Sequence, residues 1–527
     1  MKYYPIHTHL HCSHEATASI ASHMSWAKSL GIAYLWLTEH DTRMGTKKSD
    51  IPLFTFPTPE LFTRLPNGVK AGFEEAQDNN GAYSFTKSGD GYALHLSAKQ
   101  TQRESLLFHS KGKKHSNPLF AQLTITLSAD VCVEEKGTLC VEFILSAQPP
   151  SYQQACLRYA IGTPSNEADA PVQTLPFPEK RDGAYHFPIS TDVSEAIGGL
   201  DNALCNVRIS LENGASMTVR ALGFSHELNF EAVRQEQVKL AQKRGKQWQI
   251  TPFVGFEITG AGNHKNCFST KTPVIDYREF SYAVSNECAI EHLRKHDAIF
   301  SWNHPFTRTL KLDQTNEERF EWLASDLIQN NVYGATLMEV GFPMGRDTFC
   351  AQDYLRLWDR LSENGIFITG NGDSDNHHAV KDGWTEGNNF CTYAGLDDTP
   401  SEEAFVKAFR RGSVWMGNPV YMGSVSLQAN GKPMGSVLLG SQTNCVFAVQ
   451  DVKCNGFVVC VVNGQEAKRY PLRSGRADGE IPLTAQQKYN FARLEIYRED
   501  GLLIAASNPI YLIDRTEAIR PEWQDRL

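Results

Sequence analysis

The stretch Tyr3-Tyr4-Pro5-Ile6-His7-Thr8-His9-Leu10-His11 is an apolar segment that runs into alternating histidines, a pattern typical of a β-strand. In a strand, residues i and i+2 point to the same face, so His9 and His11 would aim their imidazoles at a common point. Imidazole is the commonest metal ligand in proteins. The pair therefore predicts one half of a metal site.

Other apolar segments also end in groups that bind metals. Leu35-Trp36-Leu37 leads directly to Thr38-Glu39-His40-Asp41. The later strand-end residues are Glu257 with His264 just beyond it, His304, Glu339, and the run Gly372-Asp373-Ser374-Asp375-Asn376-His377. Each of these alone would be ordinary, but their shared position after a strand predicts a single site.

Strands and helices alternate over residues 1–46 and 231–419, which indicates an α/β fold with a parallel sheet. The number of strand–helix units favours a closed barrel over an open sheet. Active sites of parallel barrels lie at the carboxyl ends of the strands, so the strand-end residues would converge there. Mixed imidazole and carboxylate ligands suit zinc, manganese or iron, and a set this large predicts two or three divalent transition metals.

Two other regions have the sequence pattern typical of β-sandwiches. Residues 47–230 contain short alternating segments between Gly, Asn, Asp and Pro clusters, and the α/β pattern resumes after them. This region is expected to be an inserted, jelly-roll-like sandwich that resembles a carbohydrate-binding module in architecture. Residues 420–527 are again short strands, and they predict a C-terminal β-sandwich.

Composition excludes several classes of function. The net charge of −9 argues against a general nucleic-acid or anionic-membrane surface. No apolar run is long enough to span a bilayer, and no signal peptide precedes the histidine strand, so a cytoplasmic protein is expected. The 12 cysteines include no Cys-x-x-Cys pair and suggest reduced thiols. The sequence leaves the oligomeric state open.

Taken together, the motifs resemble the PHP (polymerase and histidinol phosphatase) superfamily of metal-dependent phosphoesterases. The matching segments are His9-Leu10-His11, Thr38-Glu39-His40, Gly255-Phe256-Glu257 with His264, His304-Pro305, and Ser374-Asp375-Asn376-His377. The resemblance covers roughly residues 1–46 and 245–415. It implies a distorted (β/α)7 TIM-like barrel with a two- or three-metal site. The ligands carried over by the resemblance are His9, His11, His40, Glu257, His264, His304, Asp375 and His377.

The chain departs from the superfamily pattern at two places. The usual Thr-Asp-His is Thr38-Glu39-His40 here, a small change if that acid only orients His40. The usual Ser-Asp-Gly after His-x-His is replaced by His14-Glu15-Ala16, so Glu15 is the candidate substitute ligand for a third metal.

Further segments resemble the carbaryl-hydrolase-type branch of this superfamily, whose members cleave esters, carbamates or amides. These segments are His264-Lys265-Asn266, Trp302-Asn303-His304-Pro305 and Ser507-Asn508-Pro509-Ile510-Tyr511.

The expected function is that of a metal-dependent hydrolase, with a phosphoester of a small molecule as the first substrate class. Recognition of phosphate needs Arg or Lys near the metals, and Arg43, Arg308 and Lys265 occupy suitable positions. A first alternative is hydrolysis of a carboxylic ester, carbamate or amide at the same site. A second alternative is a glycan-binding or scaffold protein with a vestigial barrel, in which the inserted sandwich contacts the glycan.

Overall fold

Strand β1 (Lys2–Leu10), which carries the N-terminal histidines, has a parallel neighbour on one side and an antiparallel neighbour on the other in the computed structural model. Strand β2 (Tyr34–Leu37) pairs with it in parallel and is followed by β18 (Thr251–Val254), also parallel. On the other side, β24 (Cys391–Leu396) runs antiparallel to β1. Helix α1 (Ile20–Ser29) connects β1 to β2.

The structure describes most of the chain. The described residues are 1–12, 18, 20–41, 51–56, 58–59, 62–64, 70–75, 82–98, 103–110, 117–118, 123–147, 154–164, 172–189, 202–226, 230–259, 263–275, 285–306, 314–341, 349–377, 384, 390–514 and 519–527. The chain divides into two compact units. The first unit comprises residues 1–11, 23–42 and 241–527, and the second comprises residues 12–22 and 43–240. The last crossing of the chain between them falls inside α4 (Phe230–Trp248).

A separate five-stranded sheet in the first unit carries the remaining strand-end residues. Its order is β19 (Phe256–Ile258), β20 (Lys265–Cys267), β21 (Phe300–Trp302), β22 (Leu337–Gly341) and β23 (Thr369–Gly372). The pairs β19–β20 and β20–β21 are antiparallel, whereas β21–β22 and β22–β23 are parallel. Isolated parallel bridges, Leu10–Asn376 and His40–Glu257, link this sheet region to β1 and β2.

The predicted (β/α)7 TIM-like barrel is therefore wrong. The strands expected to form one parallel barrel divide between two sheets and mix parallel with antiparallel pairs. Over the described residues, strands predominate, and the helix-connected parallel strands that occur, such as β1–β2 and β21–β22–β23, are divided between two sheets. The physical reason is the short β20, which turns back antiparallel to β19 with no described helix between these two strands and also pairs antiparallel with β21.

The helices of the first unit pack by their apolar faces against these sheets. They are α5 (Asn286–Lys295), α6 (Asn316–Gln329), α7 (Ala351–Glu363) and α9 (Glu402–Arg411), with 3₁₀ turns η3 (Asn331–Gly334) and η4 (Pro521–Arg526). Helix α6 begins with a capping box, in which Thr315 and Glu318 satisfy each other's backbone N–H groups. Helix α9 ends at Gly412, whose φ of 68° gives the left-handed cap that glycine adopts without strain. Among the described helices, none combines enough length and apolar character to cross a bilayer.

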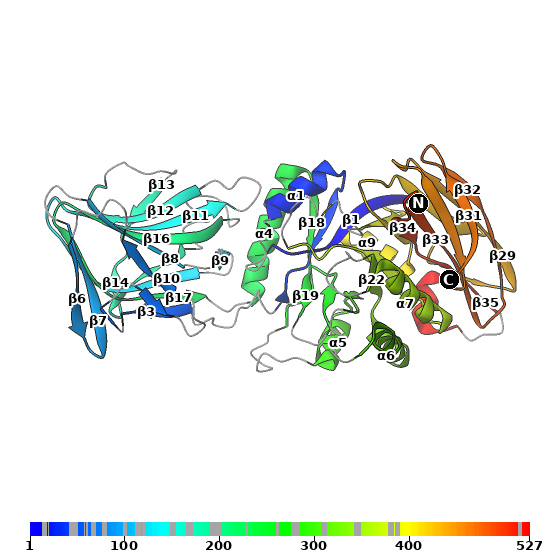
Figure 1. Ribbon diagram of the computed structural model, residues 1–527, viewed down its shortest axis with the longest axis horizontal. Helices are drawn as coiled ribbons and strands as arrows, with labels where there is room; N and C mark the ends of the chain where they lie inside the picture. The colour runs from blue at the N-terminus through cyan, green and yellow to red at the C-terminus, as the bar shows by residue number, and fades with distance from the viewer. Residues whose placement is uncertain are drawn as a thin grey trace. The chain divides into compact units, whose positions relative to one another are not determined.

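The C-terminal strands continue the sheet that contains β1. From β24 this 11-stranded sheet passes through β25 (Val414–Gly417), β34 (Leu503–Ser507), β33 (Tyr489–Arg498), β30 (Gly456–Val462) and β31 (Gln465–Leu472). Strands β28 (Val437–Leu439) and β35 (Ile510–Ile513) branch from it at β33. A four-stranded sheet lies beside it and consists of β27 (Lys432–Pro433), β26 (Ser424–Ala429), β29 (Gln442–Gln450) and β32 (Ala477–Thr484). The β-rich character predicted for residues 420–527 is confirmed, but one of its sheets is shared with β1 (Figure 1).

The second unit is built from two sheets. The seven-stranded sheet contains β3 (Ile51–Thr55), β6 (Ala82–Ser88), β7 (Gly91–Ser97), β10 (Leu123–Val133), β14 (Lys180–Arg181), β15 (Ala184–Phe187) and β17 (Ala215–His226). The eight-stranded sheet contains β4 (Phe62–Arg64), β5 (Lys70–Glu75), β8 (Arg103–Ser110), β9 (Asn117–Pro118), β11 (Thr138–Ala147), β12 (Gln154–Ile161), β13 (Val172–Pro176) and β16 (Asn202–Glu212). Phe187 of the first sheet packs 5.3 Å from Phe143 and 4.9 Å from Tyr159 of the second, ring centre to ring centre. The predicted β-sandwich is confirmed here, although its boundaries at residues 47 and 230 stay a prediction.

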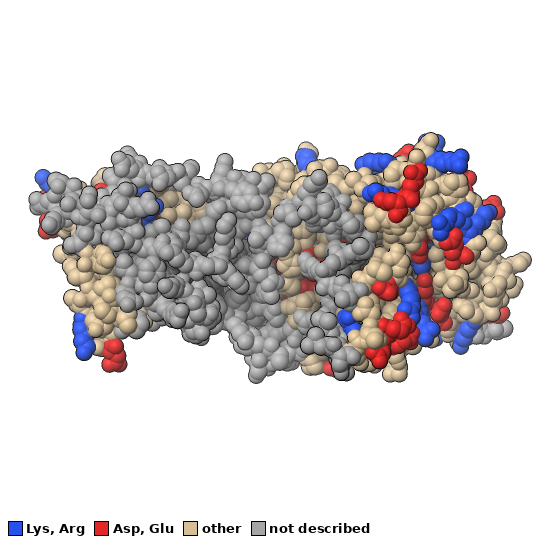
Figure 2. Space-filling view, viewed as in Figure 1, with Lys and Arg blue, Asp and Glu red and all other residues tan. Residues whose placement is uncertain are grey.

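Charged side chains of opposite sign lie side by side on the face shown in Figure 2. Ion pairs on exposed surfaces of the first unit include Arg356–Glu317 at 2.5 Å and Arg469–Glu466 at 2.7 Å. Such interspersed charge is typical of a solvated protein surface.

Candidate metal centre

The strand-end histidines and carboxylates come together where the 11-stranded and five-stranded sheets of the first unit meet. The backbone N–H of His11 donates to the carbonyl of Asn376 at 3.0 Å, and that of Glu257 donates to the carbonyl of Glu39 at 2.7 Å. These hydrogen bonds hold the ends of β1, β2, β19 and β23 side by side, so that side chains from four segments share one buried space.

His9 lies among three buried carboxylates. Its Nδ1 is 2.7 Å from Oε1 of Glu339, and its Nε2 is 3.4 Å from Oε1 of Glu257 and 3.5 Å from Oδ1 of Asp375. The side chains of His9, Glu257 and Glu339 are fully buried. Burial alone lowers the pKa of His9, but Glu339, Asp375 and Glu257 together raise it well above its usual value. The carboxylates thus favour a positive charge at this point of the site.

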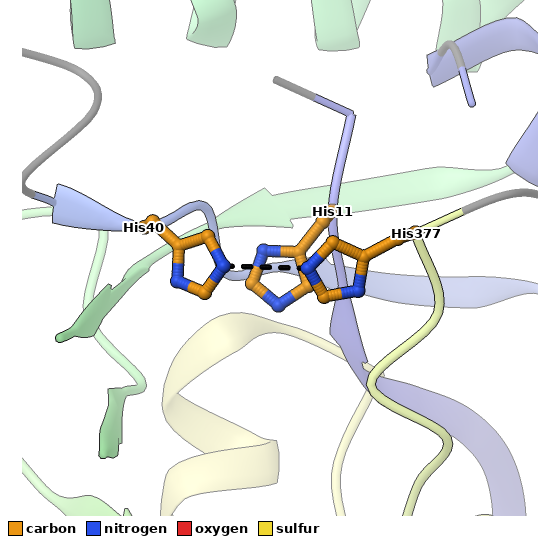
Figure 3. A group of neighbouring side chains, drawn as sticks. All are labelled: His11, His40 and His377. Carbon is orange, nitrogen blue, oxygen red and sulfur yellow. Dashed lines mark hydrogen bonds between the residues drawn. The ribbon is translucent and has the colours of Figure 1, made fainter. Parts of the chain in front are cut away.

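Three imidazoles form a compact triangle (Figure 3). The ring centre of His11 is 4.3 Å from that of His40 and 4.2 Å from that of His377. Nε2 of His40 lies 3.3 Å from Nε2 of His377. Burial, followed by His377 and His40, lowers the pKa of His11 well below its ordinary value, so its neutral, metal-binding form is favoured.

Glu257 is the carboxylate shared by the largest number of histidines. Its Oε2 lies 2.7 Å from Nδ1 of His40, and its Oε1 lies 3.1 Å from Nδ1 of His264 and 3.5 Å from Nε2 of His304. Burial raises the pKa of Glu257, but His264, His9 and His40 outweigh it and hold this pKa well below its usual range. Glu257 is therefore ionised and has histidines at both oxygens.

The segment 373–377 contributes two acids whose pKa values are shifted in opposite directions. Oδ1 of Asp375 lies 3.0 Å from Nε2 of His11, and the neighbouring histidines, His9 first, hold the pKa of Asp375 low against the effect of burial. Burial and then Glu339 raise the pKa of Asp373 well above its usual value. Two buried carboxyl groups that face each other repel when both are ionised, unless a cation lies between them.

The donor set fits divalent transition metals. Four overlapping groups have ligand atoms within 4.8 Å of one another: His11–His40–His377, His9–His11–Glu257, His40–Glu257–His264 and His9–Glu339–Asp373. Nε2 of His9 and Nε2 of His11 face each other at 3.0 Å, so both nitrogens can share one cation but cannot both carry a proton in this gap. Imidazole and carboxylate donors in this mixture suit zinc, manganese or iron.

Residues behind the cluster fix its orientation. The backbone N–H of His9 donates to Nδ1 of His7 at 3.4 Å, which leaves Nε2–H of His7 to donate to Oγ of Ser374 at 2.8 Å. Nε2 of His23 lies 2.8 Å from the carbonyl oxygen of His11. These buried contacts hold in place the end of β1, which carries His9 and His11, and the segment after β23, which carries Asp375.

Two cluster residues have positive φ angles, 25° for His304 and 47° for Asp375. Such angles are uncommon for residues with a Cβ, cost about 1–3 kcal/mol when they are strained, and often occur at functional sites. The backbone N–H of His304 donates to Oε2 of Glu339 at 2.5 Å, which opposes relaxation of that turn.

Most of the predicted ligands meet in this site. The structure brings together His9, His11, His40, Glu257, His264, His304, Asp375 and His377. Their role as ligands stays a prediction. Glu15 and the predicted phosphate-binding residues Arg43 and Arg308 lie outside the described residues.

Lys265 follows His264 in the chain, but its ammonium group contacts Asn263, Asn286 and Trp302. Its Nζ donates to the carbonyl of Asn263 and to Oδ1 of Asn286, both at 2.7 Å, and lies 4.8 Å from the ring centre of Trp302. The side chain is fully buried. This placement gives no support to the phosphate-binding role that the sequence suggested.

Two acids of the site were missing from the ligand set inferred from the motifs. Glu339 and Asp373 contact the cluster through His9 and through each other. Both follow apolar segments at strand ends, so their position was visible in the sequence, but the motif pattern did not include them.

Comparisons with known proteins leave the family open. No family model matches the sequence, and no curated protein matches it. Among solved structures, a family 12 xyloglucanase from Bacillus licheniformis is 7% identical, covers 33% of this chain and 100% of its own, and has a TM-score of 0.22. The endoglucanase cel12A from Rhodothermus marinus is 8% identical, with coverage of 32% and 96% and a TM-score of 0.23. A family 11 carbohydrate-binding module from Clostridium thermocellum is 12% identical, with coverage of 32% and 95% and a TM-score of 0.20. Likenesses this weak assign neither a fold nor a function, and the resemblance of the motifs to the PHP superfamily stays a prediction.

Proposed function

We propose that the chain is a metal-dependent hydrolase whose site holds at least two divalent transition metals. The single observation that carries the proposal is the position of Glu257. Its two carboxylate oxygens face different histidines, His40 at 2.7 Å and His264 at 3.1 Å, so one side chain can bridge two cations. Glu257 would then help to hold both metals, and a two-metal site would supply an activated water for hydrolysis.

The protein's own residues would hold and orient the metals. His9, His11, His40, Glu257, His264, His304, Glu339, Asp373, Asp375 and His377 form the donor set. When bound, such metals lower the pKa of a water molecule towards neutrality and stabilise the oxyanion that develops as water attacks. Bulk water is excluded from the side of the site that contains Glu257 and Glu339, because both side chains are fully buried.

Substrate would approach from the side of His264 and His377. Their side chains are 15% and 14% exposed, whereas those of His9 and His11 are fully buried. The open side of the donor set is therefore the side that these two imidazoles border.

A carbonyl substrate, namely a carboxylic ester, carbamate or amide, fits the described residues best. Cationic side chains commonly help to bind a phosphoester dianion. Lys265, the described member of the three predicted cations, binds Asn263 and Asn286 instead. A carbonyl substrate needs only polarisation of its oxygen, which the metals supply.

The test combines metal analysis with a panel of substrates. The purified protein is expected to hold about two transition metals per chain and to hydrolyse p-nitrophenyl acetate or an aryl carbamate in preference to p-nitrophenyl phosphate and bis-p-nitrophenyl phosphate. Glu257→Gln should abolish turnover and reduce metal content, whereas Glu317→Gln, at an exposed helix position, should change neither. Less than one metal per chain after loading would refute the proposal, and turnover of phosphate esters alone would refute its substrate class.

A further inference from the structure

The neighbouring residues Asn303 and His304 contact both carboxylates that flank His9. Nδ2 of Asn303 donates to Oε1 of Glu257 at 2.8 Å. The backbone N–H of His304 donates to Oε2 of Glu339 at 2.5 Å. One dipeptide therefore binds both of the acids that His9 contacts.

His9 completes a closed ring of contacts. Its Nδ1 lies 2.7 Å from Oε1 of Glu339, and its Nε2 lies 3.4 Å from Oε1 of Glu257. The ring runs from His9 through Glu257, Asn303, His304 and Glu339 back to His9. Because the dipeptide is short, it fixes how far apart the two carboxylates can lie.

The orientation of the Asn303 amide is unambiguous. The backbone N–H of Asn266 donates to Oδ1 of Asn303 at 3.2 Å, which requires an acceptor there and places the NH₂ group against Glu257. The backbone N–H of Asn303 donates to the carbonyl of His264 at 3.1 Å. Asn303 is only 1% exposed, and both ends of its side chain are engaged, so it acts through Glu257 and does not touch substrate.

The backbone of His304 supports the same arrangement. Its φ of 25° is unfavourable for a residue with a Cβ. Relaxation of this angle would turn its N–H away from Glu339, because the peptide plane rotates with the torsion. The hydrogen bond to a buried carboxylate compensates for the strain.

From these contacts we propose that the Asn303–His304 dipeptide is a positioning clamp, which sets the separation of Glu257 and Glu339 around His9 before a metal binds. This inference rests on the proposed function, because it gives the clamp a metal centre to organise. Asn303 is a positioning residue in this scheme. Groups that orient metal ligands typically contribute roughly 10–100-fold to metal affinity.

The test compares two Asn→Asp variants with the same local chemistry. Asn303→Asp replaces the donor to Glu257 by a carboxylate. Asn444→Asp does the same at an exposed position, where Nδ2 of Asn444 donates to Oε2 of Glu480 at 2.6 Å. Affinity for Co²⁺ is measured by competition with a chelator, and the visible absorption of bound Co²⁺ reports its coordination geometry.

Asn303→Asp and Asn303→Ala are expected to bind Co²⁺ roughly 10–100-fold more weakly and to change its absorption spectrum. Asn444→Asp should match the wild-type protein in both measurements. Near-ultraviolet circular dichroism shows whether each Asn303 variant is folded. A folded variant that retains the wild-type affinity for Co²⁺ and the wild-type Co²⁺ absorption spectrum would overturn the inference.

A crystal structure of the metal-loaded wild-type protein provides a readout that does not depend on the folding of a variant. Asn303 should remain within hydrogen-bond distance of both Glu257 and Asn266, and an amide that has left Glu257 would overturn the clamp. Failure of the proposed function is distinguishable, because then the wild-type protein itself would bind no metal.

Discussion

Nδ1 of His9 lies 2.7 Å from Oε1 of Glu339, and this contact joins the first strand of the chain to a strand more than three hundred positions later. Both side chains are fully buried. The pair brings an imidazole and a carboxylate together at the junction of two sheets, where neither has water to solvate it. Each therefore depends on the other, or on a cation, for its stability.

Glu339→Gln tests this dependence. The variant keeps the shape of the side chain but removes its charge, so we expect metal affinity to fall by about tenfold or more. Chelator competition measures the effect. Glu317→Gln, which alters an exposed ion pair with Arg356, is the control and should leave metal affinity unchanged.

Metal removal should destabilise the protein. Ligands that bind only the folded state stabilise it by about 3 kcal/mol when their free concentration is one hundred times the Kd. We expect a chelator to lower the midpoint of thermal unfolding of the first unit and an excess of Zn²⁺ or Mn²⁺ to restore it. Identical melting curves with chelator and with metal would contradict the site.

His23 should make stability depend on pH. Burial lowers its pKa from 6.5 to about 4, against the opposing effect of the hydrogen bond to the His11 carbonyl. Because the folded pKa lies below the unfolded one, the stabilising contribution is complete above pH 6.5 and is lost as the pH falls towards 4.

His23→Gln keeps an N–H donor that does not titrate, so its difference from the wild-type protein isolates this effect. Between pH 7.5 and 5, in the presence of chelator, the wild-type protein should lose roughly 2 kcal/mol more unfolding free energy than His23→Gln in urea titrations. Parallel losses in the two proteins would show that the pKa of His23 in the folded protein is not lowered from its unfolded value.

Asp359 and Arg493 form a buried ion pair between α7 and β33. Nε and Nη2 of Arg493 donate to the two oxygens of Asp359 at 2.9 and 2.7 Å. Asp359→Ala leaves a buried guanidinium with only Glu495 as its acidic partner among the contacts described, and should cost about 3 kcal/mol of unfolding free energy. Glu317→Ala breaks an exposed pair and should cost less than about 1 kcal/mol.

Lys265→Met distinguishes a structural lysine from a substrate-binding one. The substitution leaves the carbonyl of Asn263 and the amide oxygen of Asn286 without this donor, so we expect a loss of about 1–3 kcal/mol in stability. Inhibition by inorganic phosphate and the KM for an ester should stay unchanged. A weakened phosphate effect would instead place the ammonium at the substrate.

More of the candidate site than of the fold could be predicted from the sequence. Apolar runs that lead into polar residues are visible locally, and His9, His40 and Glu257 all follow such runs, although Glu257 lies inside β19. Side chains at such positions converge wherever neighbouring strands end together. They do so here even though the sheets form no seven-unit parallel barrel.

The sequence carries no comparable local signal for whether two strands pair in parallel or antiparallel. The segment Lys265–Cys267 begins with two polar residues and has no alternating apolar pattern, yet it forms a short strand antiparallel to both of its neighbours. Likewise, nothing near Cys391–Leu396 indicates that it lies antiparallel beside β1, almost four hundred residues away. These choices depend on tertiary packing, which alternation of polar and apolar residues does not encode.

The sheet that begins at β18 and β2 and runs through β1 and β24 passes without a break into the C-terminal strands by way of β25 and β34. A shortened protein ending near residue 419 would leave the backbone groups of Trp415, Met416 and Gly417 unpaired along an open edge. Such an edge invites self-association. The last hundred residues thus cover an edge of the histidine-bearing sheet, and their removal is expected to favour association of that sheet with other molecules.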